Sequence, residues 1–188
     1  MNEKETDSKE RMEEAKERMT DMKEKMTVNG IEYQIENLLG KGKGGYSYLA
    51  YRDGKQYVLK QIHHEPCEYY TFGDKIAAEQ GDYQRLLDAG IRIPMMLDID
   101  IENERIIKEY IDGPTIQELV ESDQMQEDYL AQGWEMAAKA KAAGLNIDYY
   151  PTNFVVQDGI IYYIDYECNE YMDEWSFDNW GVKYWVKE

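Results

Sequence analysis

Three dipeptide turn signals constrain the fold of this chain more than any other feature. They are Asn29-Gly30, which opens the compact part of the chain, and Asp53-Gly54 and Asp158-Gly159, each of which lies between runs rich in aromatic and β-branched residues. An Asn-Gly or Asp-Gly pair between two such runs is typical of a β-hairpin, because the tight turn requires positive φ at both central residues. We therefore expect one hairpin over residues 46–62 and another over residues 154–164.

The remaining elements follow from the spacing of apolar residues. Alternating or β-branched runs predict strands at 31–39, 95–101 and 105–111. Helical spacing predicts helices at 74–89, 116–120 and 128–143. Strands with one helix thus precede helices with one hairpin, which predicts an α+β fold of two lobes. The predicted parts are an N-terminal arm and two lobes, at 1–28, 29–110 and 111–188.

The arm differs in character from the rest of the chain. Acidic and basic residues alternate there without a glycine or proline, and Met12, Met19, Met22 and Met26 share one face of a helix. We interpret residues 1–28 as a charged helical arm that binds a partner or self-associates. The alternative is a solvated extension, since four methionines make a thin seam and specify partners poorly.

The formal net charge of −18 restricts the possible partners. It argues against nucleic acid, which requires a basic face, and against docking on an anionic membrane, while cationic substrates would be attracted. No apolar run approaches the roughly 20 residues of a membrane span, and the first residues lack the apolar stretch of a signal peptide. Cys67 and Cys168 show no metal or redox spacing, so we expect a cytoplasmic protein.

A glycine-rich segment lies between two of the predicted strands. Within it, Gly40, Gly42 and Gly45 satisfy the pattern G-x-G-x-x-G. A dinucleotide-binding turn would open a helix and a P-loop would end in Gly-Lys-Ser/Thr, whereas a strand beginning at Tyr46 follows here. Two interpretations remain: a flexible hairpin turn, and a glycine hairpin that covers nucleotide phosphates.

The second interpretation is favoured by five further residues, which follow the glycine-rich segment in a characteristic order. Lys60 lies in the strand after the glycine segment, and Glu79 lies in the following helix, where it could pair with that lysine. Asp148 and Asn153 form a D-x-x-x-x-N pattern, and Asp165 follows an apolar run. Because these last three residues flank a predicted hairpin, we expect their side chains to converge.

On these residues the chain resembles a small, divergent member of the protein-kinase-like superfamily. Residues 79–94 are similar to a helix and loop of the kinase of the KEOPS complex, and residues 105–113 resemble the last strand and hinge. Residues 164–167 resemble the metal-binding run of aminoglycoside and choline phosphotransferases. The resemblance, shared with RIO-type kinases, covers about residues 31–185. It implies a reduced bilobal fold, with a small antiparallel-sheet N-lobe carrying one helix and a truncated, mainly helical C-lobe.

The resemblance also implies a role for each candidate residue. The residues that would bind ATP are Gly40, Gly42, Gly45, Lys60, Glu109 and Ile111, the last two through hinge backbone groups. Glu79 would orient Lys60, and Asp148 would accept the proton of the attacking hydroxyl. Asn153 and Asp165 would hold Mg²⁺ through hard oxygen ligands.

Several positions depart from the family pattern. Asn146 stands where a histidine is usual, and Glu167 stands where a glycine is usual, which makes a flipping activation switch less favourable. Lys108 lies beside the hinge at a position that is usually apolar, so it points into the adenine pocket or the register slips by one. The glycine register is also open, because Gly42 and Gly44 with Ser47 fit as well.

The sequence therefore predicts an ATP- and Mg²⁺-dependent phosphotransferase that acts on a hydroxyl group. A serine/threonine protein kinase is slightly favoured by the hinge and by residues 79–94. A small-molecule kinase with a cationic acceptor is supported by the charge of −18. A pseudokinase that serves as a binding module is the third alternative, motivated by the departures at Asn146 and Glu167.

Overall fold

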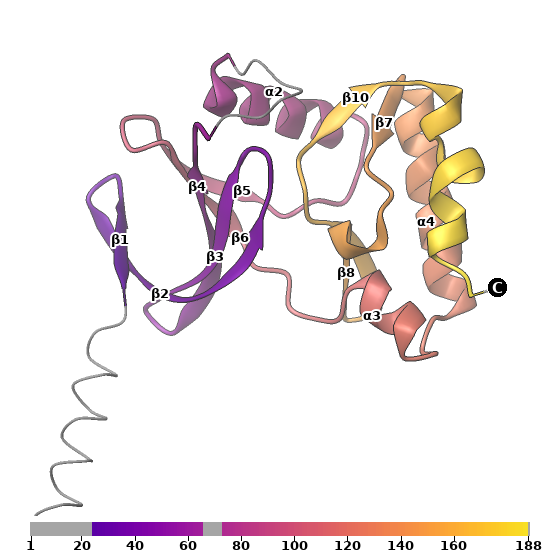
Figure 1. The fold of residues 1–188 in the computed structure, drawn as a ribbon, viewed down its shortest axis with the longest axis horizontal. Helices are drawn as coiled ribbons and strands as arrows, with labels where there is room; N and C mark the ends of the chain where they lie inside the picture. The colour runs from indigo at the N-terminus through magenta and orange to yellow at the C-terminus, as the bar shows by residue number, and fades with distance from the viewer. Residues whose placement is uncertain (1–23, 66–72, 188) are drawn as a thin grey trace, which may run out of the picture.

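The computed structural model describes residues 24–65 and 73–187 of the chain. It shows a mixed α+β fold in which a curled antiparallel sheet lies beside a half that carries two helices and two small sheets (Figure 1). The six strands of the large sheet follow the order β1-β2-β3-β4-β6-β5. This arrangement confirms the predicted α+β class and is compatible with a small-lobed, kinase-like fold.

The described elements fall into these two halves. The first contains β1 (Lys25–Val28), β2 (Ile31–Lys41), β3 (Gly45–Arg52), β4 (Lys55–Ile62), α2 (Lys75–Asp88), β5 (Met96–Asp100) and β6 (Arg105–Glu109). The second contains α3 (Ile116–Glu121), α4 (Glu127–Ala142), β7 (Leu145–Ile147), β8 (Phe154–Gln157), β9 (Ile160–Tyr163) and β10 (Cys168–Glu170). Short helical turns occupy Pro151–Asn153, Asp173–Trp175, Phe177–Gly181 and Val182–Tyr184.

Two of the dipeptide turns form the hairpins that the sequence predicts, and Asn29-Gly30 forms a third hairpin, which the sequence does not predict. Asn29, Asp53 and Asp158 have φ values of 47°, 50° and 52°, and the glycine after each of them also has positive φ. These turns join β1 to β2, β3 to β4 and β8 to β9, all in antiparallel pairs. Local turn chemistry therefore sets three of the strand pairings.

The end of the predicted N-terminal arm is corrected by the structure. Lys25–Val28 is a strand that pairs with β2, so Met26 lies in the sheet and not on a helical face. Val28 is fully buried against Tyr33 and Ile35, and this burial favours the extended pairing over continuation of a helix. The rest of the helical prediction, residues 1–23, lies outside the described residues, as does Cys67.

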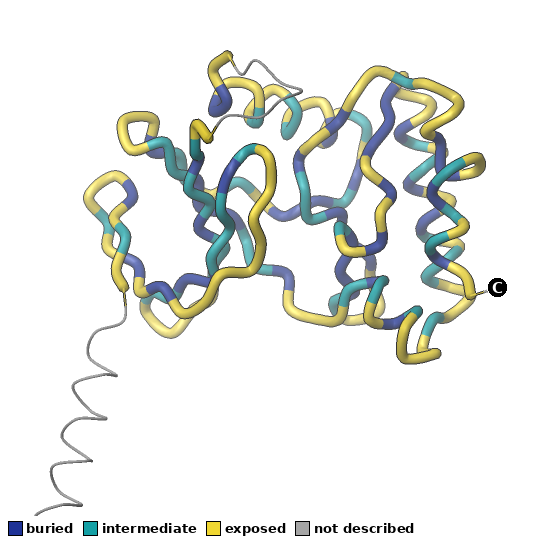
Figure 2. Tube along the Cα trace, viewed as in Figure 1, coloured by how far each residue is buried: buried dark blue, intermediate teal, exposed yellow. Residues whose placement is uncertain are grey.

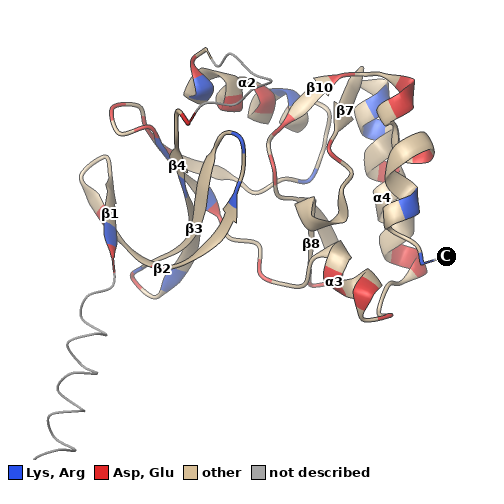
Figure 3. Cartoon of the chain, viewed as in Figure 1, with Lys and Arg blue, Asp and Glu red and all other residues tan. Residues whose placement is uncertain are grey.

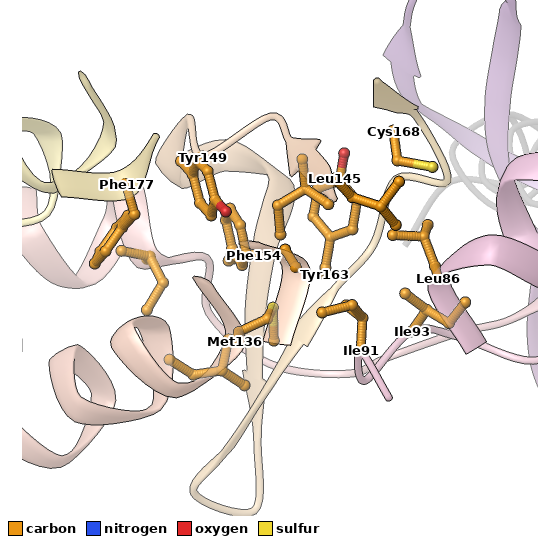
Figure 4. Close-up of a cluster of buried hydrophobic side chains, with 14 of the residues drawn as sticks. Leu86, Ile91, Ile93, Met136, Leu145, Tyr149, Phe154, Tyr163, Cys168 and Phe177 are labelled. Carbon is orange, nitrogen blue, oxygen red and sulfur yellow. The ribbon is translucent and has the colours of Figure 1, made fainter. Parts of the chain in front are cut away.

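Helix α2 packs against both halves of the molecule. Ile76 near its start is buried with Ile62 and Ile106 of the sheet. Leu86 near its end belongs to the large apolar core of the second half, together with Met136 and Tyr163 (Figure 4). Figure 2 shows buried positions near the two ends of this helix, with exposed and intermediate positions between them. The middle of α2, which carries Glu79, is thereby held beside the junction of the two halves.

The connection between the halves is fixed by a close backbone contact. Gly113 has φ of +155°, and a Cβ atom at this position would lie 1.9 Å from the carbonyl oxygen of Val156. Val156 donates a backbone hydrogen bond to Pro114, and Thr115 forms a bridge with Val155. The chain that leaves β6 is therefore anchored on β8, which sets the sheet half against the hairpin of the second half.

Candidate active site

A cavity of about 840 Å³ lies at the junction of the two halves. Its walls come from the glycine-rich segment, β4, α2, the connection after β6, and the segments on either side of the β8–β9 hairpin. Every residue implied in ATP or Mg²⁺ binding lines it: Gly40, Gly42, Gly45, Lys60, Glu79, Glu109, Ile111, Asn153 and Asp165. A cavity of this size is ample for a small ligand.

The glycine-rich segment forms the turn between β2 and β3. Gly42 donates a backbone hydrogen bond to Gly45, and a Cβ atom at Gly45 would lie 2.4 Å from the Gln61 carbonyl oxygen. Gly44 is the glycine nearest Lys60, since a Cβ there would lie 3.6 Å from the lysine Nζ. A Cβ at Gly40 meets nothing, so only Gly45 is required by the packing of the protein itself.

Lys60 and Glu79 form a short ion pair in the cavity. The lysine Nζ lies 2.6 Å from Glu79 Oε2, and the two side chains are 14% and 9% exposed. The strand pairing of β4 with β3 and β6 aims Lys60 at α2, whose position is fixed at both ends. Among the described residues, the other Glu79 oxygen, Oε1, is buried without a hydrogen-bond partner. The structure thus brings together the two residues that the sequence paired.

Asn153 and Asp165 face the cavity from the two ends of the β8–β9 hairpin. Their segments lie side by side, since the Ile164 amide donates to the Asn153 carbonyl oxygen at 2.9 Å. Asp165 Oδ1 accepts the Tyr166 amide at 2.7 Å, and no hydrogen bond from a described residue reaches Oδ2. Two of the three side chains that the sequence grouped therefore line one cavity, whereas the third, Asp148, does not.

Asp148 lies beside this pair but is exposed and does not line the cavity. Its Oδ1 accepts the Tyr150 amide at 3.1 Å, and its carbonyl oxygen accepts the Asn153 side-chain amide at 3.4 Å. The carboxylate is therefore presented at the rim, where a molecule outside the cavity could reach it.

Lys108 is a site residue whose position the sequence left open. It is 5% exposed, it lines the cavity, and its Nζ donates to the Ile164 carbonyl oxygen at 3.1 Å. The same ammonium lies 4.0 Å from the centre of the Tyr166 ring. Burial, reinforced by the nearby charge of Lys60, lowers the pKa of Lys108 to about 8. Its amine is thus directed to the Asp165 segment.

Asn146 is a second residue whose part could not be predicted. It is buried in β7, where its side-chain amide donates to the Trp175 carbonyl oxygen at 3.1 Å and its oxygen accepts the Met172 amide. This asparagine therefore holds the C-terminal segment against β7. The only sequence signal was its place two residues before Asp148.

Glu109 and Ile111, the two predicted hinge residues, differ in the contacts that they make. The Glu109 amide donates to the Met95 carbonyl oxygen at 2.9 Å, and its carboxylate accepts the Met95 amide at 3.1 Å. The Glu109 N–H is therefore already occupied within the sheet. Ile111 is buried at 5% exposure and contributes to the cavity wall.

Asn153 and Asp165 supply too few oxygen ligands for a metal site formed by protein side chains alone. Over residues 24–65 and 73–187, no group of three or more His, Cys, Asp or Glu side chains is arranged to hold a metal ion. Mg²⁺ bound with a polyphosphate needs only one or two carboxylates or amides, because phosphate and water oxygens complete its coordination. The donor set fits that second kind of site.

Comparison with known proteins supports a kinase-like relationship. No protein-family model matches the chain. The KEOPS complex subunit Bud32 of Pyrococcus abyssi is 27% identical over 93 residues, which are 48% of this chain and 42% of that protein. The match thus spans less than half the length of either protein.

Within the described part of the chain, no helix is long and apolar enough to cross a membrane.

Proposed function

We propose that this protein is an ATP- and Mg²⁺-dependent phosphotransferase that transfers the γ-phosphate of ATP to a hydroxyl acceptor. The observation that carries the proposal is the 2.6 Å pair of Lys60 with Glu79 beneath the glycine-rich segment, in the cavity that Asn153 and Asp165 also line. Glycine backbone and a fixed lysine on one wall, with oxygen ligands on the other, fit a bound polyphosphate.

The protein's contribution would be positional and electrostatic. The transition state of phosphoryl transfer is loose, so a catalyst mainly aligns the reacting oxygens and neutralises charge. Lys60 would bind phosphate oxygens, and its pairing with the largely buried Glu79 keeps the ammonium from swinging into solvent. The backbone of the glycine-rich segment would lie close to the phosphates, because no side chain at Gly42, Gly44 or Gly45 keeps them apart.

Asn153 and Asp165 would hold Mg²⁺ with the phosphates. Bound Mg²⁺ supplies charge neutralisation to the triphosphate. Asp165 Oδ2 and the Asn153 side-chain oxygen would serve as its protein ligands, since Asp165 Oδ1 and Asn153 Nδ2 already make hydrogen bonds. These two side chains thus retain one oxygen each for a cation.

Asp148 would accept the proton of the acceptor hydroxyl. Its carboxylate is exposed at the rim, and the Tyr150 amide fixes one of its oxygens. A serine or threonine of a protein is the favoured acceptor from the hinge resemblance. A cationic alcohol of low molecular mass is the second candidate, favoured by the net charge of −18.

Thermal unfolding with ATP, with and without Mg²⁺, tests the nucleotide site. At about 100 times its Kd a ligand stabilises the native state by roughly 2.7 kcal/mol. We expect a Mg²⁺-dependent stabilisation that Asp165→Asn removes and that Asp178→Asn, an exposed acid outside the cavity, retains. No response of the wild type to ATP or GTP would contradict the proposal.

Measuring the transfer of labelled γ-phosphate from ATP to an acceptor then distinguishes an enzyme from a non-catalytic binding module. We expect turnover with protein or cationic alcohol acceptors, and its loss in Asp148→Asn with ATP binding retained. Binding of ATP without any transfer, in wild type and variant alike, would instead favour a non-catalytic nucleotide-binding module.

A further inference from the structure

Lys108 places a charge where an apolar residue would be the stable choice. It lies in β6 opposite Val58, next to the terminal Tyr57–Glu109 pair of the pairing between β4 and β6, and is 5% exposed. Moving an ammonium out of water costs free energy that a single hydrogen bond does not fully restore. An apolar side chain of similar length would avoid this cost. The lysine therefore requires an explanation in its contacts.

Both contacts of the ammonium are with the immediate neighbours of Asp165. Nζ donates to the Ile164 carbonyl oxygen at 3.1 Å, and it lies 4.0 Å from the Tyr166 ring centre. A cation over an aromatic face is attracted to it, most strongly where water is excluded. The ammonium thus holds the residue before Asp165 and the residue after it.

The other contacts of this segment come from outside the large sheet. The Ile164 amide donates to Asn153, and the Tyr166 hydroxyl donates to the Pro94 carbonyl oxygen at 2.6 Å. The Tyr166 ring also packs on Tyr83 of α2, with ring centres 5.0 Å apart. Lys108 adds a contact from β6, the strand that pairs with the Lys60-bearing strand β4.

We infer that Lys108 is a positioning residue, which fixes the Ile164–Tyr166 segment against the large sheet and thereby sets the Asp165 carboxylate relative to the Lys60–Glu79 pair. The inference deepens the proposed function, and its consequence for Mg²⁺ rests on that function. Glu167 after this segment is consistent with a fixed arrangement, since it lacks the conformational freedom of the glycine usual there.

Amide hydrogen exchange in nucleotide-free protein tests the positioning directly. The Tyr166 amide reports on Asp165, because it donates to Asp165 Oδ1 at 2.7 Å. In Lys108→Met, we expect its exchange to be at least about tenfold faster, from loss of a hydrogen bond to a charged group and a cation–aromatic contact. The midpoint of thermal unfolding should be unchanged or higher, since a buried charge is removed. Lys55→Met, at the exposed start of β4, is the matched control.

A second pair of variants serves if Lys108→Met does not fold. Tyr166→Leu removes the ring beneath the ammonium, whereas Tyr166→Phe removes only the hydroxyl that reaches Pro94. The inference expects faster exchange at residues 164–167 in the leucine variant than in the phenylalanine variant. Equal exchange in these two, or wild-type exchange in Lys108→Met, would overturn it.

The Mg²⁺ requirement of ATP binding distinguishes positioning from simple electrostatics. Removing a nearby positive charge should strengthen Mg²⁺ binding, because like charges repel. Releasing the Asp165 segment should weaken it. In Lys108→Met we therefore expect at least about a threefold rise in the Mg²⁺ concentration at half-maximal thermal stabilisation by ATP, with Lys108→Arg closer to wild type. A fall would overturn the inference. If the wild type shows no such response, the proposed function fails, and the exchange experiment still decides the role of Lys108.

Discussion

The burial of Lys108 makes the stability of this protein depend on pH. The pKa of this lysine falls from 10.5 in the unfolded chain to about 8 in the folded protein. Between these values the unfolded state binds more protons than the native state, so the free energy of unfolding rises with pH. Between about pH 7.5 and about pH 9 we expect the wild type to gain about 1 kcal/mol from this residue. Urea unfolding at several pH values measures the gain.

Lys108→Met is the reference for that measurement. Burial raises the pKa of the Cys168 thiol to about 12 and also raises the pKa of Tyr163, so these groups affect stability at higher pH in both proteins. The difference between wild type and variant isolates the lysine. A difference that stays constant across this range, or that grows in favour of the variant as pH rises, would show that Lys108 is not held in a site that disfavours its charge.

The grouping of candidate side chains could be predicted where it depends on order along the chain. Lys60, Glu79 and Asp165 line one cavity, and their order on a strand, a helix and the end of a hairpin is what the sequence showed. Lys108 and Asn146 could not be assigned in the same manner. Their partners are the backbone carbonyl oxygens of Ile164 and Trp175. Every residue type has a backbone carbonyl oxygen, so the sequence does not indicate which one accepts the hydrogen bond.

At the scale of single elements, we expect substitution of two helical glycines by alanine to change the free energy of unfolding in opposite directions. Gly81 in α2 has open space where a Cβ would lie, whereas a Cβ at Gly133 in α4 would lie 2.7 Å from the Trp185 ring. Glycine inside a helix costs roughly 0.5–1 kcal/mol relative to alanine. Gly81→Ala should therefore raise the free energy of unfolding by about that amount. Gly133→Ala should lower it, because overpacking a core costs about 1–3 kcal/mol.

Chemical denaturation of the two variants under one condition provides the comparison. Each acts as the control for the other, since both replace a helical glycine by the same residue. Stabilisation by both substitutions would mean that Trp185 can move away from α4 at little cost. That result would be at odds with its full burial and with the 2.8 Å hydrogen bond from its ring nitrogen to the Tyr149 carbonyl oxygen.

The elements that could be predicted are those with local signals. Hairpins around Asp53-Gly54 and Asp158-Gly159 were found because the turn residues themselves determine the geometry. Strands β1, β7 and β10 were missed. Each has only three or four residues, and β7 and β10 pair with each other across a wide sequence separation. Such strands exist because a distant partner satisfies their backbone groups, so a local pattern does not reveal them.

At the scale of the whole molecule, charge is unevenly distributed. The cavity is lined by five lysines and five acidic residues, which balance one another: Lys41, Lys43, Lys60, Lys75, Lys108, Glu79, Asp82, Glu109, Asp165 and Glu167. The net charge of −18 therefore belongs to the rest of the chain. Acidic residues occur along both halves in Figure 3. A polyanion approaching the cavity would meet a repulsive long-range field and a local group of cations.

Ionic strength should separate these two contributions to ATP association. The Debye length falls from about 30 Å at 0.01 M salt to about 8 Å at 0.15 M, so added salt screens the distant acids more than the lysines that touch the ligand. We expect the association rate constant of a fluorescent ATP analogue, followed by stopped flow, to rise at least about threefold over this range. Adenosine carries no charge, and its association should not change. A rate that falls with salt would mean that the cavity lysines govern the encounter even at long range, as in sites that steer anions. The −18 charge would then have no part in selecting what reaches this cavity, and the argument from charge for a cationic acceptor at the rim beside Asp148 would lose its basis.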